Sequence, residues 1–221
     1  MFKNEDFLIF TEDRRNNGQS NGICVMNKTG NCIKTINKSK IPQSIFFIEA
    51  TYFENKSYLL LSGNTYDQGK SLYYTYTECY NYDDEDIKSY GIEDNNGYDN
   101  CYCMNLFKKG NKIYLITGSK EKINIYEFET CKLIKRIQLG EGYVYGLCSI
   151  NEKYIIASNS YKLKIIDMEN IEKSYVIKEY SVHCDCGEKN SEIKGIKKIK
   201  IPEKGEFIIT YSQYSIKILK V

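Results

Sequence analysis

A two-strand unit recurs in this 221-residue chain and constrains its fold more than any other feature of the sequence. The segment LITGSKEKINIYEF at 115–128 reappears as IIASNSYKLKIIDM at 155–168 and as IITYSQYSIKILKV at 208–221. Each copy has an apolar run that ends in small residues, a tight polar turn, and a second run of alternating apolar residues. This pattern predicts β-hairpins. Copies in the same register indicate a repeat architecture.

A second motif is also repeated, since KTGNCIKTI at 28–36 is matched by ETCKLIKRI at 129–137. Each copy has a short turn followed by a β-type run of alternating apolar and polar residues. A turn at this place in both copies favours the same structural role for both segments. We therefore expect two equivalent strands in two equivalent repeats.

The rest of the chain is divided into short runs rich in β-branched and aromatic residues, separated by Asn, Gly, Asp, Ser and Lys. The runs cover 7–10, 22–26, 32–36, 44–53, 57–63, 71–77, 101–107, 112–118, 122–128, 132–139, 143–150, 153–159, 162–168, 174–180, 193–201, 206–212 and 215–221. No apolar period of 3.6 residues continues for three turns, so no long helix is predicted. The chain is predicted to be all-β.

The spacing of the repeats indicates the size of each unit. The first apolar triplets begin at 8, 59, 115, 155 and 208, so they are separated by 51, 56, 40 and 53 residues. The shortest spacing matches a four-stranded propeller blade of about 40 to 45 residues, and loop insertions account for the longer ones. A blade is unstable alone, because its two faces must be covered by neighbouring blades.

Several short motifs resemble those of the WD-repeat family of β-propellers. Tyr126-Glu127 and Ile166-Asp167 stand where that family has Trp-Asp at the end of its third strand, and Gly118-Ser119 closes a second strand. ETCKLIKRI resembles the family's turn and outer strand, which implies that the two copies of this phrase form the outer edges of two blades. The resemblance covers nearly the whole chain, but the chain has no Trp and lacks the family's Gly-His pair.

The resemblance implies a single WD40-like propeller portion over 1–221, with blades at about 1–40, 41–97, 98–140, 141–190 and 191–221. With strands named a to d from the axis outward, the count is bcd, abcd, abcd, abcd and abc, or about four and a half to five blades. This count favours the C-terminal part of a larger propeller, or a half that another chain completes. A closed ring of five blades is the alternative, in which the first blade lacks its inner strand.

Composition excludes several classes of function. The net charge of +2 gives no strong attraction to nucleic acid or to anionic membranes. The nine cysteines lack the regular spacing of a secreted disulfide framework, which favours a reducing compartment. The first six residues are too polar for a signal peptide, and no window has eighteen uninterrupted apolar residues. We therefore expect a cytoplasmic protein without a membrane partner.

Residues that could bind a metal or catalyse a reaction are few. His183, Cys184 and Cys186 form the most suggestive cluster, but Cys-x-Cys is tighter than usual zinc spacing, and Cys101 and Cys103 would have to complete the site. We expect no metal and no cofactor. His183 is the only histidine and lies away from any nucleophile motif, so we expect no catalytic residues and no enzyme.

Two charged runs have both a structural and a functional interpretation. The acidic run Asp83–Asp86 could bind calcium or a basic peptide, although its spacing is not that of an EF-hand, and a solvated loop between strands c and d is favoured. Lys197, Lys198 and Lys200 surround Ile199, but in a strand they do not share one face. A phosphate-binding stripe is therefore not favoured.

The remaining candidate site is the rim of the propeller axis, which the resemblance implies is formed by loops between blades and the first residues of the inner strands. The residues expected there are Tyr98, Asn100, Tyr143, Tyr145 and Glu192. Exposed tyrosines are frequent anchors of protein interfaces. The sequence thus favours a non-catalytic scaffold that presents its loops to a protein or peptide. The alternative is a regulatory module of a larger enzyme, for example a kinase or ligase.

Overall fold

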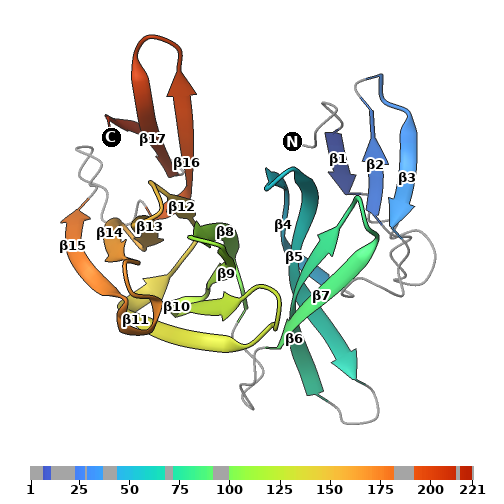
Figure 1. Ribbon diagram of the computed structural model, residues 1–221, viewed down its shortest axis with the longest axis horizontal. Coiled ribbons are helices and arrows are strands. Elements are labelled where there is room, and N and C mark those ends of the chain that lie inside the picture. The colour runs from blue at the N-terminus through green and yellow to red at the C-terminus, as the bar shows by residue number, and fades with distance from the viewer. Residues whose placement is uncertain are drawn as a thin grey trace. The chain divides into compact units, whose positions relative to one another are not determined.

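The computed structural model is all-β and of the β-propeller class, built from antiparallel sheets. It describes residues 7–10, 23–27, 29–36, 44–67, 72–91, 100–181, 192–212 and 215–220. The chain divides into two compact units, an N-terminal unit of Met1–Asn100 and a C-terminal unit of Cys101–Val221 (Figure 1). Each unit consists of sheets in which strands that are consecutive in the sequence lie side by side.

The N-terminal unit contains two sheets. The first has three strands, β1 (Phe7–Phe10), β2 (Ile23–Met26) and β3 (Cys32–Ile36). The second has four strands, β4 (Ser44–Phe53), β5 (Lys56–Asp67), β6 (Leu72–Asn81) and β7 (Asp86–Gly91). An apolar cluster joins the sheets, with Ile23, Val25 and Ile36 from the first packed against Leu59 and Leu61 of β5.

The C-terminal unit contains three sheets. The first comprises β8 (Cys103–Lys109), β9 (Lys112–Gly118), β10 (Lys120–Glu127) and β11 (Leu133–Tyr143). The second comprises β12 (Leu147–Ser149), β13 (Tyr154–Asn159), β14 (Lys162–Asp167) and β15 (Tyr175–Ser181), with the short 3-10 helix η2 (Ile171–Lys173) before β15. The third comprises β16 (Ile193–Ile201), β17 (Gly205–Ser212) and β18 (Ile216–Lys220).

The three sheets of the C-terminal unit meet through their first strands. Strand β12 contacts both β8 and β16, so it lies between the inner strands of its neighbours. Cys148 and Ile156 of the second sheet pack with Ile196 and Ile208 of the third in one buried cluster. Inner strands that meet, with sheets stacked face to face, are the packing that a propeller requires.

Burial follows the position of each strand within its sheet. The second strands β9 and β13 are buried along nearly their whole length, because both of their faces are covered. The fourth strand β15 is exposed at almost every residue. This gradient explains why the sequence shows continuous apolar runs in some strands and mixed runs in others.

The repeated segments at 28–36 and 129–137 contain two equivalent edge strands. β3 ends the strand order of its sheet, and β11 ends the order of the first sheet in the C-terminal unit. The turns before them also match, since Gly30 and Cys131 occupy the same place and both have positive φ, 83° and 57°. Glycine adopts this left-handed conformation without strain, whereas cysteine does so at a cost.

The predicted ends of the third strands are also confirmed. β10 ends at Glu127 and β14 ends at Asp167, and the preceding residues Tyr126 and Ile166 are fully buried. Glu127 forms an ion pair with Lys112 at 2.8 Å. Apolar and acidic residues therefore take, in each strand, the positions that the resemblance assigned to Trp and Asp.

The structure corrects the sequence prediction in two places. β7 was not among the predicted runs, and it supplies the fourth strand that the blade count required. The predicted strand at 143–150 is divided, because β11 continues to Tyr143 and β12 begins only at Leu147. Residues 144–146 form a loop that leads into the inner strand β12, and this loop contributes to the candidate site.

Candidate functional site

In the C-terminal unit, the segments that lead into the inner strands form backbone hydrogen bonds to residues at the turns between the second and third strands. Val144 N–H donates to Ser119 O at 3.0 Å, and Ile193 N–H donates to Ser160 O at 2.7 Å. Tyr102 N–H donates to Gly118 O at 2.8 Å. The backbone at the start of each inner strand is therefore fixed, and the side chains that it carries are held close together.

Gly146 allows two of these strand starts to approach closely. A Cβ placed on Gly146 would lie 2.7 Å from the backbone nitrogen of Ile196 and 3.1 Å from the carbonyl carbon of Gly195. Only a residue without a side chain fits at this distance. The contact brings the loop that contains Tyr145 next to the first residues of β16.

Three tyrosine rings gather at this end of the unit. The ring centroid of Tyr102 lies 5.3 Å from that of Tyr143 and 5.3 Å from that of Tyr145, with edge-to-face geometry in both pairs. The centroids of Tyr143 and Tyr145 are 5.7 Å apart. All three residues are half-buried. Edge-to-face aromatic pairs at these distances stabilise one another, which keeps the rings in place.

A lysine and a glutamate border the tyrosines. The ammonium of Lys194 lies 4.4 Å from the ring centroid of Tyr145 and forms an ion pair with the Glu192 carboxylate at 2.6 Å. Tyr102, Tyr143, Tyr145, Glu192 and Lys194 are called the tyrosine cluster below. The cluster offers aromatic faces, one positive group and one negative group within a few residues of three inner strands.

The surroundings of Tyr145 and Lys194 raise the pKa of both side chains. Burial raises the pKa of Tyr145 above its ordinary value, so the phenol stays neutral. Burial by itself would lower the pKa of Lys194, but the hydrogen bond that Lys194 donates to Glu192 and the proximity of Tyr145 raise it overall. Lys194 is therefore charged and the Tyr145 phenol beside it is neutral, as a cation–π contact requires.

The structure brings together three of the residues proposed from the sequence and adds two. Tyr143, Tyr145 and Glu192 lie in the tyrosine cluster, whereas Tyr102 and Lys194 were not predicted. Asn100 is half-buried and precedes Tyr102 by two residues. Tyr98 lies outside the described residues.

The acidic run lies at the connection between the third and fourth strands of its sheet, as the sequence favoured over a calcium or peptide site. It forms the turn between β6 and β7, where Asp83 accepts a hydrogen bond from Ser57 N at 2.7 Å and Asp84 pairs with Lys56 at 2.6 Å. Glu85 pairs at 2.7 Å with Lys34, a residue of β3 in the neighbouring sheet. These carboxylates bind the protein's own cations and backbone, and thereby link the two sheets of the N-terminal unit.

The proposed metal ligands do not form a site in the described part of the chain. His183, Cys184 and Cys186 lie outside it. Cys101 and Cys103 are buried, and their thiols contact backbone carbonyls, Cys101 Sγ that of Cys103 and Cys103 Sγ that of Val144, each at 3.2 Å. Among the described residues, no three His, Cys, Asp or Glu side chains are arranged to hold a metal ion.

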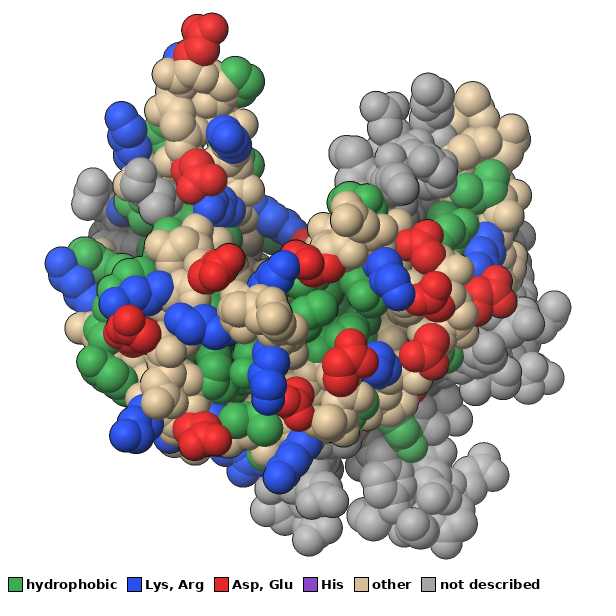
Figure 2. Space-filling view, in the orientation of Figure 1, with side chains coloured by type: hydrophobic (Ala, Val, Ile, Leu, Met, Phe, Trp, Pro, Cys, Tyr) green, Lys and Arg blue, Asp and Glu red, His purple; other side chains and the backbone are tan. Residues whose placement is uncertain are grey.

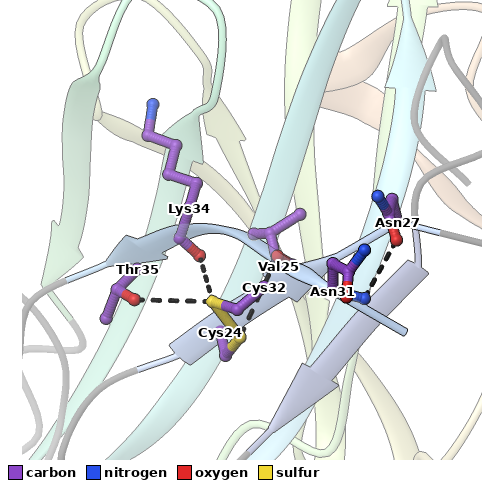
Figure 3. Close-up of a disulfide and its surroundings, with 7 residues drawn as sticks. All are labelled: Cys24, Val25, Asn27, Asn31, Cys32, Lys34 and Thr35. Atoms are coloured by element: carbon purple, nitrogen blue, oxygen red, sulfur yellow. Dashed lines mark hydrogen bonds between the residues drawn. A yellow bond between two sulfur atoms is a disulfide. The ribbon is translucent and has the colours of Figure 1, made fainter. Parts of the chain in front are cut away.

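A disulfide joins Cys24 of β2 to Cys32 of β3, a pair that the expectation of reduced cysteines did not include (Figure 3). The two Cα atoms are 6.0 Å apart. Thr35 lies directly opposite Cys24, and its Oγ1 is 3.6 Å from the sulfur of Cys32. The disulfide closes the turn that contains Gly30, because adjacent strands place the two cysteines together.

The lysine run of β16 is divided between the two faces of its sheet, as expected from its sequence. Lys198 pairs with Glu206 at 2.8 Å and donates to Ile150 O at 2.6 Å, so it faces the preceding sheet. Lys197 is on the opposite face, directly across from Ile209. Figure 2 shows positive and negative side chains interspersed over the visible face, which is not the pattern of a nucleic-acid stripe.

No protein-family model and no curated protein sequence matches the chain. Among solved structures, 342 chains match its fold. One is the crystal structure of the computationally designed Ika8 protein, which is 10% identical in sequence and superposes with a TM-score of 0.54. The match covers all of this chain and 57% of the designed one, so this chain spans a little over half of that length. At this identity the likeness concerns the fold alone.

In the described residues, no helix combines the length and the apolar character that a membrane-spanning helix needs. The one helical element found there, η2, has three residues.

Proposed function

We propose that this chain is a non-catalytic interaction module, a degenerate WD-like propeller portion that binds a protein or peptide through the tyrosine cluster. The observation that supports this proposal is the convergence of Tyr102, Tyr143 and Tyr145 beside the Glu192–Lys194 pair. Propellers commonly serve as scaffolds for protein partners, and here the tyrosine cluster lies at and beside the starts of three inner strands.

The chemistry of the tyrosine cluster suits a peptide. Half-buried tyrosines offer large apolar faces and hydroxyl groups at a small entropic cost, because each side chain has few rotatable bonds. Lys194 and Glu192 add a hydrogen-bond donor and an acceptor of opposite charge. Rings held by one another and by a fixed backbone need little reorganisation on binding, which favours affinity.

A selection with a random peptide library tests this proposal. The library is panned on the wild-type chain, and enriched peptides are then titrated against Tyr145→Ala and against Tyr175→Ala. Tyr175 is an exposed tyrosine of β15 outside the tyrosine cluster, so it serves as the matched control. We expect Tyr145→Ala to weaken binding at least tenfold and Tyr175→Ala to leave it unchanged. Peptides that bind both variants as well as the wild type would contradict the proposal.

The alternative from the sequence, a regulatory module of a larger enzyme such as a kinase or ligase, would use the same surface. No contact among the described residues favours it over a free-standing scaffold. We propose a cytoplasmic location with no role for a cofactor, and the net charge of only +2 supports a function without nucleic acid.

A further inference from the structure

Lys194 is held by two groups of the tyrosine cluster. Its ammonium lies 4.4 Å from the ring centroid of Tyr145 and donates a hydrogen bond to the Glu192 carboxylate at 2.6 Å. Tyr145 lies in the loop before β12, whereas Lys194 is the second residue of β16, so the contact joins two sheets. An aromatic face beside a carboxylate is a binding site for an organic cation. The protein's own lysine therefore occupies a cation site.

The electrostatics of this position favour a positive charge. The face of a neutral aromatic ring carries the negative part of its quadrupole, and burial raises the pKa of Tyr145, which keeps the phenol neutral. Burial alone would lower the pKa of Lys194, yet this pKa is raised overall by Glu192 and Tyr145. The position therefore stabilises a cation by more than partial burial penalises it.

The ring and the carboxylate are held in place, whereas Lys194 reaches them through a flexible stem. Ile193, the residue between Glu192 and Lys194, is 2% exposed, and its N–H donates to Ser160 O at 2.7 Å, which fixes the backbone. The Tyr145 ring packs against two further tyrosine rings. The Lys194 side chain is 43% exposed, and ion pairs of this kind contribute little, because a long side chain loses rotamer freedom in them. Lys194 can therefore leave while the site stays formed.

Other lysine–tyrosine contacts of the chain differ from this one. Lys34 lies 4.4 Å from the ring centroid of Tyr82, but it is 24% exposed and also donates to the Tyr82 carbonyl at 3.3 Å, which ties two sheets together. Lys153 lies 5.4 Å from the ring centroid of Tyr154, its neighbour in sequence. Lys194 is more exposed than Lys34 and contacts a ring that belongs to a group of three. Of these contacts, it is the one best suited to exchange its cation with that of a partner.

We propose that the position of the Lys194 ammonium is the binding site for a lysine or arginine side chain of a protein partner, and that Lys194 blocks this site until the partner displaces it. This inference rests on the proposed function, because it names the kind of peptide that the tyrosine cluster binds. The partner's cation then lies on the Tyr145 ring beside Glu192, and the Lys194 ammonium moves into water. Lys194 thus opposes binding twice, by filling the site and by repelling a second positive charge.

The strength of the internal contact sets the expected effect of removing it. Lys194→Met keeps the length of the side chain but not its charge, and it is expected to raise the affinity for a basic peptide by about three- to tenfold, the range of an exposed ion pair with a cation–π contact. Glu192→Gln, added to Lys194→Met, removes the carboxylate when no internal lysine competes. This second change is expected to reverse most of the gain, because the incoming cation loses its ion pair.

Titrations of the full chain followed by nuclear magnetic resonance test the proposal. The probes are the acetylated tripeptide amides Ala-Lys-Ala, Ala-Arg-Ala and Ala-norleucine-Ala, and the signal is the backbone amide of Ile193. The lysine or the arginine peptide binds Lys194→Met more tightly than the wild type, and the tighter of the two identifies the cation. The uncharged norleucine peptide shows no such gain. Lys153→Met is the matched control, because Lys153 also lies beside a tyrosine and pairs with Glu169 at 2.7 Å, outside the tyrosine cluster.

Three results overturn the proposal. Basic peptides that bind the wild type and Lys194→Met equally would show that Lys194 does not occupy the ligand's place. An equal gain in Lys153→Met would show an effect of overall charge alone. A norleucine peptide that binds as tightly as the basic ones, or no binding of any probe to Lys194→Met, would show that the site does not recognise a cation. Amide spectra establish that each variant is folded, and Lys194→Gln gives the same comparison if Lys194→Met does not fold.

The peptide-library selection separates this failure from that of the proposed function. Selected peptides that depend on Tyr145 but carry no basic residue would overturn the cation site and leave the interaction module standing. A selection that yields no Tyr145-dependent peptide, together with no binding of the three probes, would overturn both.

Discussion

Replacing Gly146 by alanine is expected to destabilise the C-terminal unit far more than the same change at Gly195. The Cβ of Gly146→Ala would lie 2.7 Å from the backbone nitrogen of Ile196, whereas carbon atoms in good contact are about 3.5 to 4.0 Å from their neighbours. The backbone of β16 would have to shift by about 0.8 Å, since no side-chain rotation relieves the clash. Overpacking of this kind costs about 1 to 3 kcal/mol, and a rigid neighbour favours the upper end.

The substitution also brings a gain, which reduces the net effect. Alanine restricts the unfolded chain more than glycine does, which stabilises the folded state by about 0.4 to 1 kcal/mol. The free energy of unfolding of Gly146→Ala is therefore expected to fall by about 2 kcal/mol.

Gly195 provides the matched control because its close neighbour is flexible. The atoms nearest to an added Cβ belong to the ring and hydroxyl of Tyr211, whose side chain is 42% exposed and can turn outward. The rotamer cost of about 0.5 to 1.5 kcal/mol roughly offsets the gain in the unfolded state. Gly195→Ala is therefore expected to remain within about 0.5 kcal/mol of the wild type.

Hydrogen exchange of the amides in β12 and β16 measures the change locally, which matters because the two units can open separately. Urea unfolding followed by circular dichroism gives the matching global value. Equal stabilities for the two variants, or a Gly146→Ala protein as stable as the wild type, would refute the argument that backbone contact at Gly146 limits the approach of these strands.

Three further predictions concern the N-terminal unit. Cys32→Ser, or reduction of the wild type, is expected to lower the free energy of unfolding of this unit by about 2 to 3 kcal/mol, because the disulfide spans eight residues and restricts the unfolded chain. Urea unfolding with and without reductant measures the loss, and Cys131→Ser is the control. Lys34→Ala is expected to lower the free energy of unfolding by about 1 to 2 kcal/mol, because the ammonium contacts the ring and the carbonyl of Tyr82 as well as Glu85. Glu85→Gln, which removes only the exposed ion pair, is expected to change it by at most about 0.5 kcal/mol. Thermal unfolding compares the two variants, and equal effects would contradict this ordering. Burial raises the pKa of the Glu78 carboxyl, so the folded state binds this proton more tightly than the unfolded state and loses stability as pH rises through the folded pKa. Glu78→Gln is therefore expected to be more stable than the wild type at pH 7, and this advantage disappears below the unfolded pKa of about 4.3. Unfolding of both proteins at a series of pH values measures the difference.

Most strands could be predicted from the sequence because their apolar residues alternate or run continuously. β7 was missed because the segment DIKSYG offers only Ile87 and Tyr90 as apolar residues, which is typical of an outer strand with little of its surface buried. The division between β11 and β12 was missed because Val144 and Leu147 continue the apolar run across the loop. Propensity alone cannot show where hydrogen bonding passes from one sheet to the next.

The candidate site was partly predictable for a related reason. Tyr143 and Tyr145 could be proposed because they are among the first residues of a predicted inner strand, and Glu192 because it directly precedes another. Tyr102 and Lys194 became evident only from the close approach at Gly146 and from the contacts between separate loops, which depend on tertiary structure. The disulfide was missed because Cys24 and Cys32 lie in adjacent strands without being register partners, and no recognisable spacing marks them as a pair.

The hydrogen bonds that hold the loops at the tyrosine cluster also bear on how such a surface can change over time. They join backbone atoms only, from Ser119 O to Val144 N and from Ser160 O to Ile193 N. The side chains at 102, 143, 145 and 194 can therefore be exchanged without disturbing the bonds that place them. A lineage could acquire a new binding preference by point substitution at these positions while its loop geometry stays the same.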